Sequence, residues 1–151
     1  MPRFIVTAIQ GGADTTSSAT IETGIVADSK SGILITGFDV HWVNGSGVAA
    51  ADYEVRAQLN TVSGALAFSS VDQVDQICWG LQNTAGVAVA VPYEPTKQIV
   101  LTEPRLTVQP NIYFTLSSTG TAQANQATVR VYYEIVKLTD IELLRLLVGG
   151  A

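Results

Sequence analysis

The sequence is poor in the residues that most catalytic and metal sites need. Its 151 residues include one cysteine, Cys78, and one histidine, His41. A single cysteine cannot form a disulfide within the chain. Zinc sites generally gather three or four Cys or His ligands, so two such residues argue against a zinc site. We therefore expect no metal and no cofactor.

Charge is also scarce. Charged residues make up 14% of the chain, against about 25% in an average soluble domain. Eight Lys and Arg stand against thirteen Asp and Glu, for a net charge of −5, and the basic residues form no cluster. Nucleic-acid binding requires several phosphates to be neutralised, so we expect no direct binding of nucleic acid. A surface with so little charge belongs either to a β protein with Thr-rich outer faces or to a subunit covered by neighbours.

Long apolar segments are missing as well. No stretch approaches the ~20 apolar residues that span a bilayer, so we expect no transmembrane segment. The first residues, Met1 to Val6, lack the pattern of a signal peptide. A chain of 151 residues suits one domain.

What the sequence does contain is a strand-like alternation of apolar and polar residues. In the segment Ile33–Val43, Leu34, Phe38, Val40 and Trp42 are expected on one face, and Asp39 and His41 on the other. Clusters rich in Gly, Ser and Asn separate the segments, which indicates an antiparallel β-sandwich. Pro92, Pro95, Pro104 and Pro110 are expected to bound strands rather than interrupt them. We predict strands at Phe4–Ile9, Thr20–Ala27, Ile33–Val43, Asp52–Asn60, Gln76–Leu81, Val87–Val91, Gln98–Thr102, Leu106–Val108, Ile112–Leu116 and Thr128–Leu138.

The end of the chain has a different pattern. Thr139 and Glu142 form a capping box, and Leu138 is placed to pack against Leu143, so we predict a helix from Thr139 to about Val148. This divides the chain into a sandwich at 1–138 and a helix with its tail at 139–151. The helix either plugs the open end of its own sandwich or docks onto a neighbouring subunit. We favour docking, because a small sandwich has little room to bury both sides of a helix. The expected contact residues are Ile141, Leu143, Leu144, Leu146, Leu147 and Val148.

Few residues could support chemistry. Asp39 could orient His41, but no serine stands in a nucleophile-elbow context. Cys78 lies in an apolar setting and is expected to be structural. Asp72 and Asp75 lie in a predicted loop and could contribute to a calcium or hydrolytic site, although a solvated loop accounts for them better. We expect no enzymatic activity.

Two aromatic residues offer an alternative function. Trp79 and Tyr93 lie beside predicted loops and could stack on sugar rings. On this interpretation the chain is a carbohydrate-binding, lectin-like sandwich module.

The layout resembles that of small jelly-roll proteins of virus particles. The resemblance rests on the aromatic segment Val129–Leu138 with the short apolar helix after it, and on the segment Gly32–Trp42. It implies a jelly-roll fold, a location in the virion and a structural, self-assembling capsid or outer-layer subunit. The partners would be copies of the chain itself and possibly a second shell protein. Many such proteins carry a basic arm, whereas this chain has only Arg3 near its start, so the resemblance does not extend to genome binding.

Overall fold

A computed structural model describes residues 3–12, 15–26, 30–43, 53–67, 70–84, 87–90, 96–119 and 125–149. For residues 42–43, 53, 77–84, 87–90, 96–97, 125 and 149 within these ranges, only the backbone is described.

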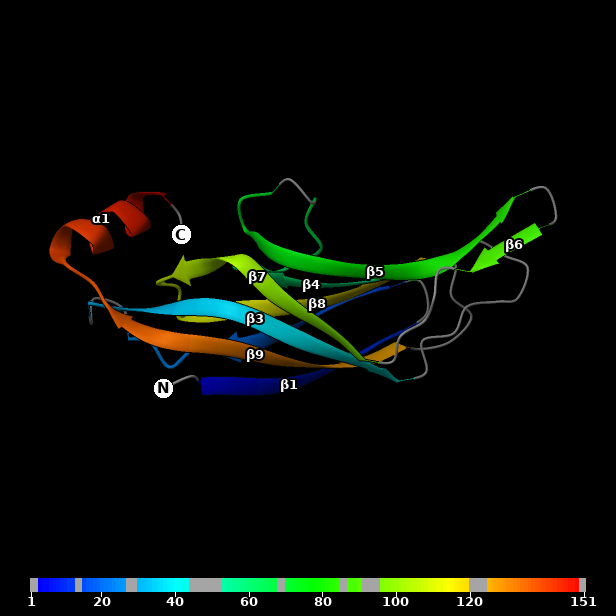
Figure 1. The fold of residues 1–151 in the computed structure, drawn as a ribbon, viewed down its shortest axis with the longest axis horizontal. Helices are drawn as coiled ribbons and strands as arrows, with labels where there is room; N and C mark the ends of the chain where they lie inside the picture. Colours follow the sequence, from blue (N-terminus) through cyan, green and yellow to red (C-terminus); the bar gives the residue numbers. More distant parts are fainter. Residues whose placement is uncertain are drawn as a thin grey trace.

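The described strands form two antiparallel sheets packed face to face (Figure 1). The first sheet has four strands in the order β1 (Arg3–Gly11), β9 (Asn125–Lys137), β3 (Ser31–Val43) and β7 (Thr96–Thr107). The second has five, in the order β2 (Thr16–Glu22), β8 (Asn111–Thr119), β4 (Tyr53–Asn60), β5 (Gln73–Thr84) and β6 (Val87–Ala90). The helix α1 (Asp140–Gly149) follows β9 and lies at the end of the sandwich opposite β6. The predicted all-β sandwich with a C-terminal helix is confirmed.

The strand order is that of a jelly roll. β1 pairs with β9, β2 with β8, β3 with β7 and β4 with β5, all antiparallel. These pairs are nested along the chain, as in one long hairpin that has been rolled up. The further pairs β3–β9 and β4–β8 close the roll into two sheets. Such double-sheet rolls occur in capsid and lectin domains, so the topology alone does not choose between these functions.

The core lies between the sheets and follows the predicted alternation. Phe38, Val131, Leu59 and Phe114 are fully buried, and they come from strands of both sheets. On β4 the alternating residues Val55 and Ala57 are likewise 0% exposed. The β9 strand, apolar on both faces, is central, between β1 and β3.

The face assignment in β3 was wrong in part. Ile33 and Ile35 are fully buried, together with Phe38 and Val40, whereas Leu34 is half-buried. The register shifts between Ile35 and Gly37. The irregularity inserts an extra residue and reverses the alternation of the side chains.

Two strand boundaries were also wrong. Gln98–Thr102 and the first two residues of Leu106–Val108 belong to the single strand β7 (Thr96–Thr107), with Pro104 inside it. Proline is tolerated there because β7 is at the edge of its sheet and the register is irregular at this point. The strand predicted at Thr20–Ala27 runs instead over Thr16–Glu22. The chain turns directly afterwards, where Thr23 donates its N–H to the Pro110 carbonyl at 3.0 Å and Gly24 has a φ of 74°.

Candidate functional site

Hydrogen bonds in its first turn stabilise the helix α1. The Glu142 carboxylate accepts hydrogen bonds from the backbone N–H and the hydroxyl of Thr139, both at 2.8 Å. In return the Glu142 N–H donates to the Thr139 hydroxyl at 3.3 Å, which completes the predicted capping box. These hydrogen bonds lower the pKa of Glu142 below its ordinary value of 4.5, the backbone bond being the larger cause.

The segment before the helix ties it to the sandwich. Leu138 is 9% exposed and donates its N–H to the Lys30 carbonyl at 2.8 Å. It covers Gly32, where an added Cβ would lie 3.3 Å from the Leu138 Cδ1. The Lys30 ammonium then pairs with Asp140 at 2.8 Å. The helix therefore leaves the sandwich in a fixed direction.

The rest of α1 exposes most of its apolar side chains. Leu143 and Leu146 are half-buried and face the same side of the helix. Four residues define what we call the α1 stripe: Ile141 (66% exposed), Leu144 (63%), Leu147 (52%) and Val148 (81%). Ile141, Leu144 and Val148 follow the spacing i, i+3, i+7 that places side chains on one helix face. The described part of the chain does not cover this face. Docking of α1 onto a neighbouring subunit stays a prediction.

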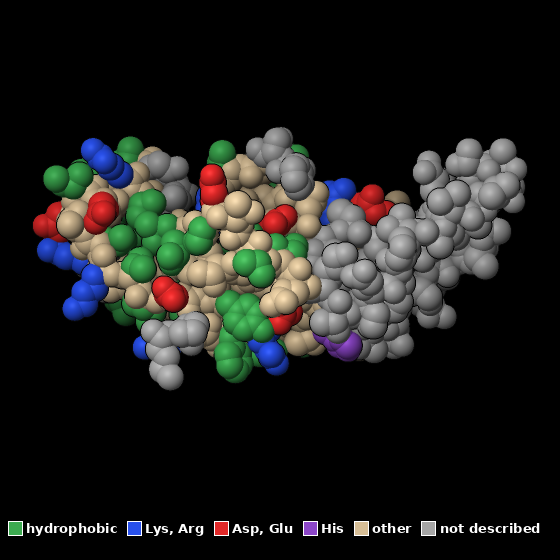
Figure 2. All heavy atoms as spheres, viewed as in Figure 1, with side chains coloured by type: hydrophobic (Ala, Val, Ile, Leu, Met, Phe, Trp, Pro, Cys, Tyr) green, Lys and Arg blue, Asp and Glu red, His purple; other side chains and the backbone are tan. Residues whose placement is uncertain are grey.

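A second exposed apolar surface lies on the outer face of the four-stranded sheet. Phe4, Tyr132, Gly37 and Val100 are register partners on β1, β9, β3 and β7, and so form one row across the sheet, here called the apolar row. Phe4 is 60% and Val100 75% exposed. Figure 2 shows patches of hydrophobic side chains on this face of the molecule, with single charged groups among them. The next row is more polar: Arg130 lies over the Phe4 ring, and Asp39 accepts a hydrogen bond from the Tyr132 hydroxyl at 2.5 Å.

Part of the outer face of the five-stranded sheet, around Gln58 on β4, is covered by contrast. Gln58, which the alternation along β4 places on the face opposite Val55 and Ala57, is 0% exposed. Its amide donates to the Leu66 carbonyl at 2.8 Å and to Gln76 at 2.9 Å, and its oxygen accepts the Leu66 N–H at 3.0 Å. Asn60 bonds to the Gly64 carbonyl at 2.6 Å in the same way. The segment after β4 thus folds back over this sheet and supplies hydrogen-bond partners to the amide groups of Gln58 and to the amide nitrogen of Asn60.

Of the residues singled out for chemistry, the structure describes the side chains of Asp39, His41, Asp72 and Asp75. His41 is exposed at the end of β3, on the same outer face as Asp39, as predicted. The Asp72 carboxylate accepts a hydrogen bond from the Thr61 hydroxyl at 3.4 Å, and that of Asp75 accepts the Gln76 N–H at 2.7 Å. Asp75 lies within β5 rather than in a loop, which corrects the prediction. Among the described residues, no three His, Cys, Asp or Glu side chains gather as metal ligands would.

Several predicted residues fall outside the described part of the chain. Tyr93 is one, and for Trp79, Cys78 and Trp42 only the backbone in β5 and β3 is described. The possible sugar-binding face of Trp79 and Tyr93 therefore stays a prediction.

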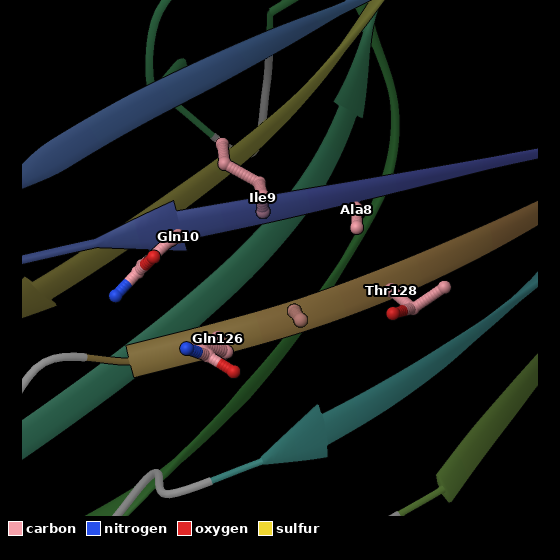
Figure 3. A pocket seen from close by; sticks show the side chains of 6 residues that line it. Ala8, Ile9, Gln10, Gln126 and Thr128 are labelled. Atoms are coloured by element: carbon pink, nitrogen blue, oxygen red, sulfur yellow. The ribbon is translucent and has the colours of Figure 1, made fainter.

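A shallow hollow of about 300 Å³ lies along β1 and β9 (Figure 3). It is lined by Ala8, Ile9, Gln10, Gln126, Ala127 and Thr128. These side chains carry no titratable group, so the hollow offers neither a general acid nor a general base. In the part of the chain that the structure describes, no helix is long and apolar enough to cross a bilayer.

No protein-family model and no curated protein sequence matches the chain. A search of solved structures matches a chain in the structure of infectious bursal disease virus, Gx strain, with 15% identity and a TM-score of 0.28. The match covers 93% of this chain and 34% of that one, so this chain spans about a third of the length of the viral protein.

Proposed function

We propose that the chain is a structural subunit of a virus particle, a capsid or outer-layer protein without catalytic activity. It acts through contacts with copies of itself, and its place is the virion. The observation that carries this proposal is the α1 stripe, four large apolar side chains that are between 52% and 81% exposed on a firmly capped helix.

The physical argument concerns the cost of leaving the stripe in water. Full burial of one Leu, Ile or Val side chain is worth about 1.5–3 kcal/mol. A helix at the end of a chain, with a fixed exit direction and an apolar outer face, is suited to insert into a neighbour. The apolar row on the outer face of the four-stranded sheet offers an apolar surface of this kind to receive it.

The low charge supports the same proposal. With 14% charged residues, the chain has few groups that would keep copies of it apart. Jelly-roll domains serve as capsid subunits in many particles, and this topology places the C-terminal helix outside the sandwich. The scattered basic residues fit a subunit that does not itself grip the genome.

The test is a double substitution on the exposed helix face, Leu144→Lys with Val148→Lys. We expect the purified variant to lose assemblies larger than a dimer while its far-UV circular dichroism and melting temperature stay unchanged, since both residues are exposed. The matched control, Thr102→Lys with Thr119→Lys, adds the same charge at exposed polar positions and should assemble normally. Normal assembly of the Leu144→Lys/Val148→Lys protein would contradict the proposal.

A further inference from the structure

The strand β1 forms one border of the four-stranded sheet. Among the described strands its neighbour in the sheet is β9 alone, and in Figure 1 no described element lies beyond it. Every second residue of such a strand directs its N–H and C=O groups away from the sheet, toward solvent or a further strand. The nine residues of β1 span about 30 Å, which is long for an open edge.

The two edges of this sheet differ in their protection. The opposite edge, β7, carries Lys97, Glu103, Pro104 and Arg105, and its register is broken. Charges, proline and irregular register are the features that keep edge strands from pairing. β1 pairs with β9 without interruption from Arg3 to Gly11, and after Arg3 it contains neither a charged residue nor a proline. The β1 edge is therefore open to another strand, whereas the β7 edge is blocked.

We infer that β1 pairs with β1 of a second copy of this chain, antiparallel across a two-fold axis, to form one eight-stranded sheet. This interface is distinct from the α1 stripe and does not depend on it. The preferred register places Thr7 opposite Thr7 of the second copy.

A second copy fits this edge better than another partner would. In the Thr7 register, Ile5 lies opposite Ile9 of the other copy on the inner face, and both residues already pack at the core. On the outer face Val6 lies opposite Ala8 of the other copy. No charged side chain faces another, because the eight residues from Phe4 to Gly11 are all uncharged. A charged partner strand would find no opposite charge along this stretch. In the pairing of β1 with a second β1, by contrast, uncharged residues face uncharged residues at each position from Phe4 to Gln10.

The test uses two full-length double variants with opposite charges on the outer face of β1. One is Val6→Lys with Ala8→Lys, and the other is Val6→Glu with Ala8→Glu. Val6 is 50% exposed and Ala8 is exposed, so both variants should fold. Because Val6 is the register partner of Arg130, the Lys variant should melt slightly below the Glu variant. Each alone places like charges opposite one another and should weaken the dimer about tenfold in Kd. An equimolar mixture places Lys opposite Glu and should recover dimers, measured by sedimentation velocity across a concentration series.

The matched control changes the opposite edge, with Gln98→Lys and Thr102→Lys, and should leave the dimer intact. All proteins are also prepared with Leu144→Lys and Val148→Lys, so that contacts through α1 do not contribute to the measured mass. A monomer in that background with β1 unchanged would overturn the inference, as would variants that stay dimeric alone or fail to recover on mixing. Failure of the α1 proposal would give a different result: Leu144→Lys/Val148→Lys would leave assembly intact, while the β1 variants still altered it.

Discussion

Gly37 stands where the sheet has no room for a side chain. A Cβ added at this position would collide with the backbone carbonyl oxygen of Ile99 on the neighbouring strand. The backbone there belongs to the irregular stretch that returns Phe38 and Val40 to the core. The absence of a side chain also leaves a gap in the apolar row between Tyr132 and Val100.

We predict that Gly37→Ala destabilises the protein by about 1–3 kcal/mol, the usual cost of forcing an extra group into a packed site. Urea denaturation followed by tryptophan fluorescence measures the change. Gly12→Ala is the control, because its added Cβ would meet only the Thr15 side chain, at 3.4 Å or more. Equal stability of the two variants would mean that the backbone at Gly37 moves aside without cost.

Gln58 is a polar residue on the outward side of the alternation in β4, and yet it is fully buried. Its side chain takes the place of water for the N–H and C=O of Leu66. We predict that Gln58→Leu costs about 1–3 kcal/mol, because it leaves these polar groups without their partner. Hydrogen exchange should also accelerate at the Leu66 amide. Gln98→Leu, at an exposed position, is the control and should change neither quantity.

At the scale of single residues, the sequence predicted the buried apolar residues well, and it predicted poorly the residues that depart from simple alternation. Val55, Ala57, Phe114 and Val131 follow simple alternation, which local sequence contains. The burial of Gln58 depends on a loop that folds back from several residues away, and no periodic pattern records that contact. The apolar row was missed for a similar reason: Phe4 and Val100 become neighbours of Tyr132 and Gly37 only through long-range register.

Among the elements, α1 was the one predicted most completely. Its cap, its start and its apolar composition are all local, so the sequence contains them. The strand β7 was predicted as two pieces, because Pro104 normally ends a strand, and only the position of β7 at the sheet edge makes it tolerable. The β1 edge was not predicted, since which strand lies outermost is a property of the topology.

The Glu142 cap makes the stability of α1 depend on pH. Because folding lowers the pKa of this carboxyl, its contribution is complete above the unfolded value of about 4.5 and is lost as pH falls through the lower folded value. We therefore predict that the amide of Thr139 loses protection, and α1 loses helix, in acid below pH 4.5. Glu142→Gln keeps a capping side chain without a titrating group. An identical acid transition in that variant would show that another group is responsible.

At the scale of the whole molecule, the two sheets differ in their outer faces. A loop covers the five-stranded sheet at Gln58 and Asn60, while the four-stranded sheet leaves Phe4 and Val100 exposed. The fold class was predictable, because ten short strand-like segments separated by turns favour an antiparallel sandwich or barrel over the other fold classes. The strand order was not, because each nested pair joins segments far apart in the sequence.

If the apolar row receives α1 of a neighbour, a charge placed in it should weaken assembly. We predict that Val100→Lys, at a residue 75% exposed, raises the concentration needed for assembly severalfold without lowering the melting temperature. Light scattering during a concentration series measures it, with Val71→Lys as the control at a residue 74% exposed outside the row. Equal effects of the two substitutions would remove the apolar row as the receiving surface.

The central claim is that the chain is built to assemble, and the most direct measurement is the mass and shape of the purified wild-type protein. Light scattering and electron microscopy of the same sample supply both. We predict closed shells, regular sheets or defined symmetric oligomers. A uniform 15.9 kDa monomer at every concentration would contradict the account.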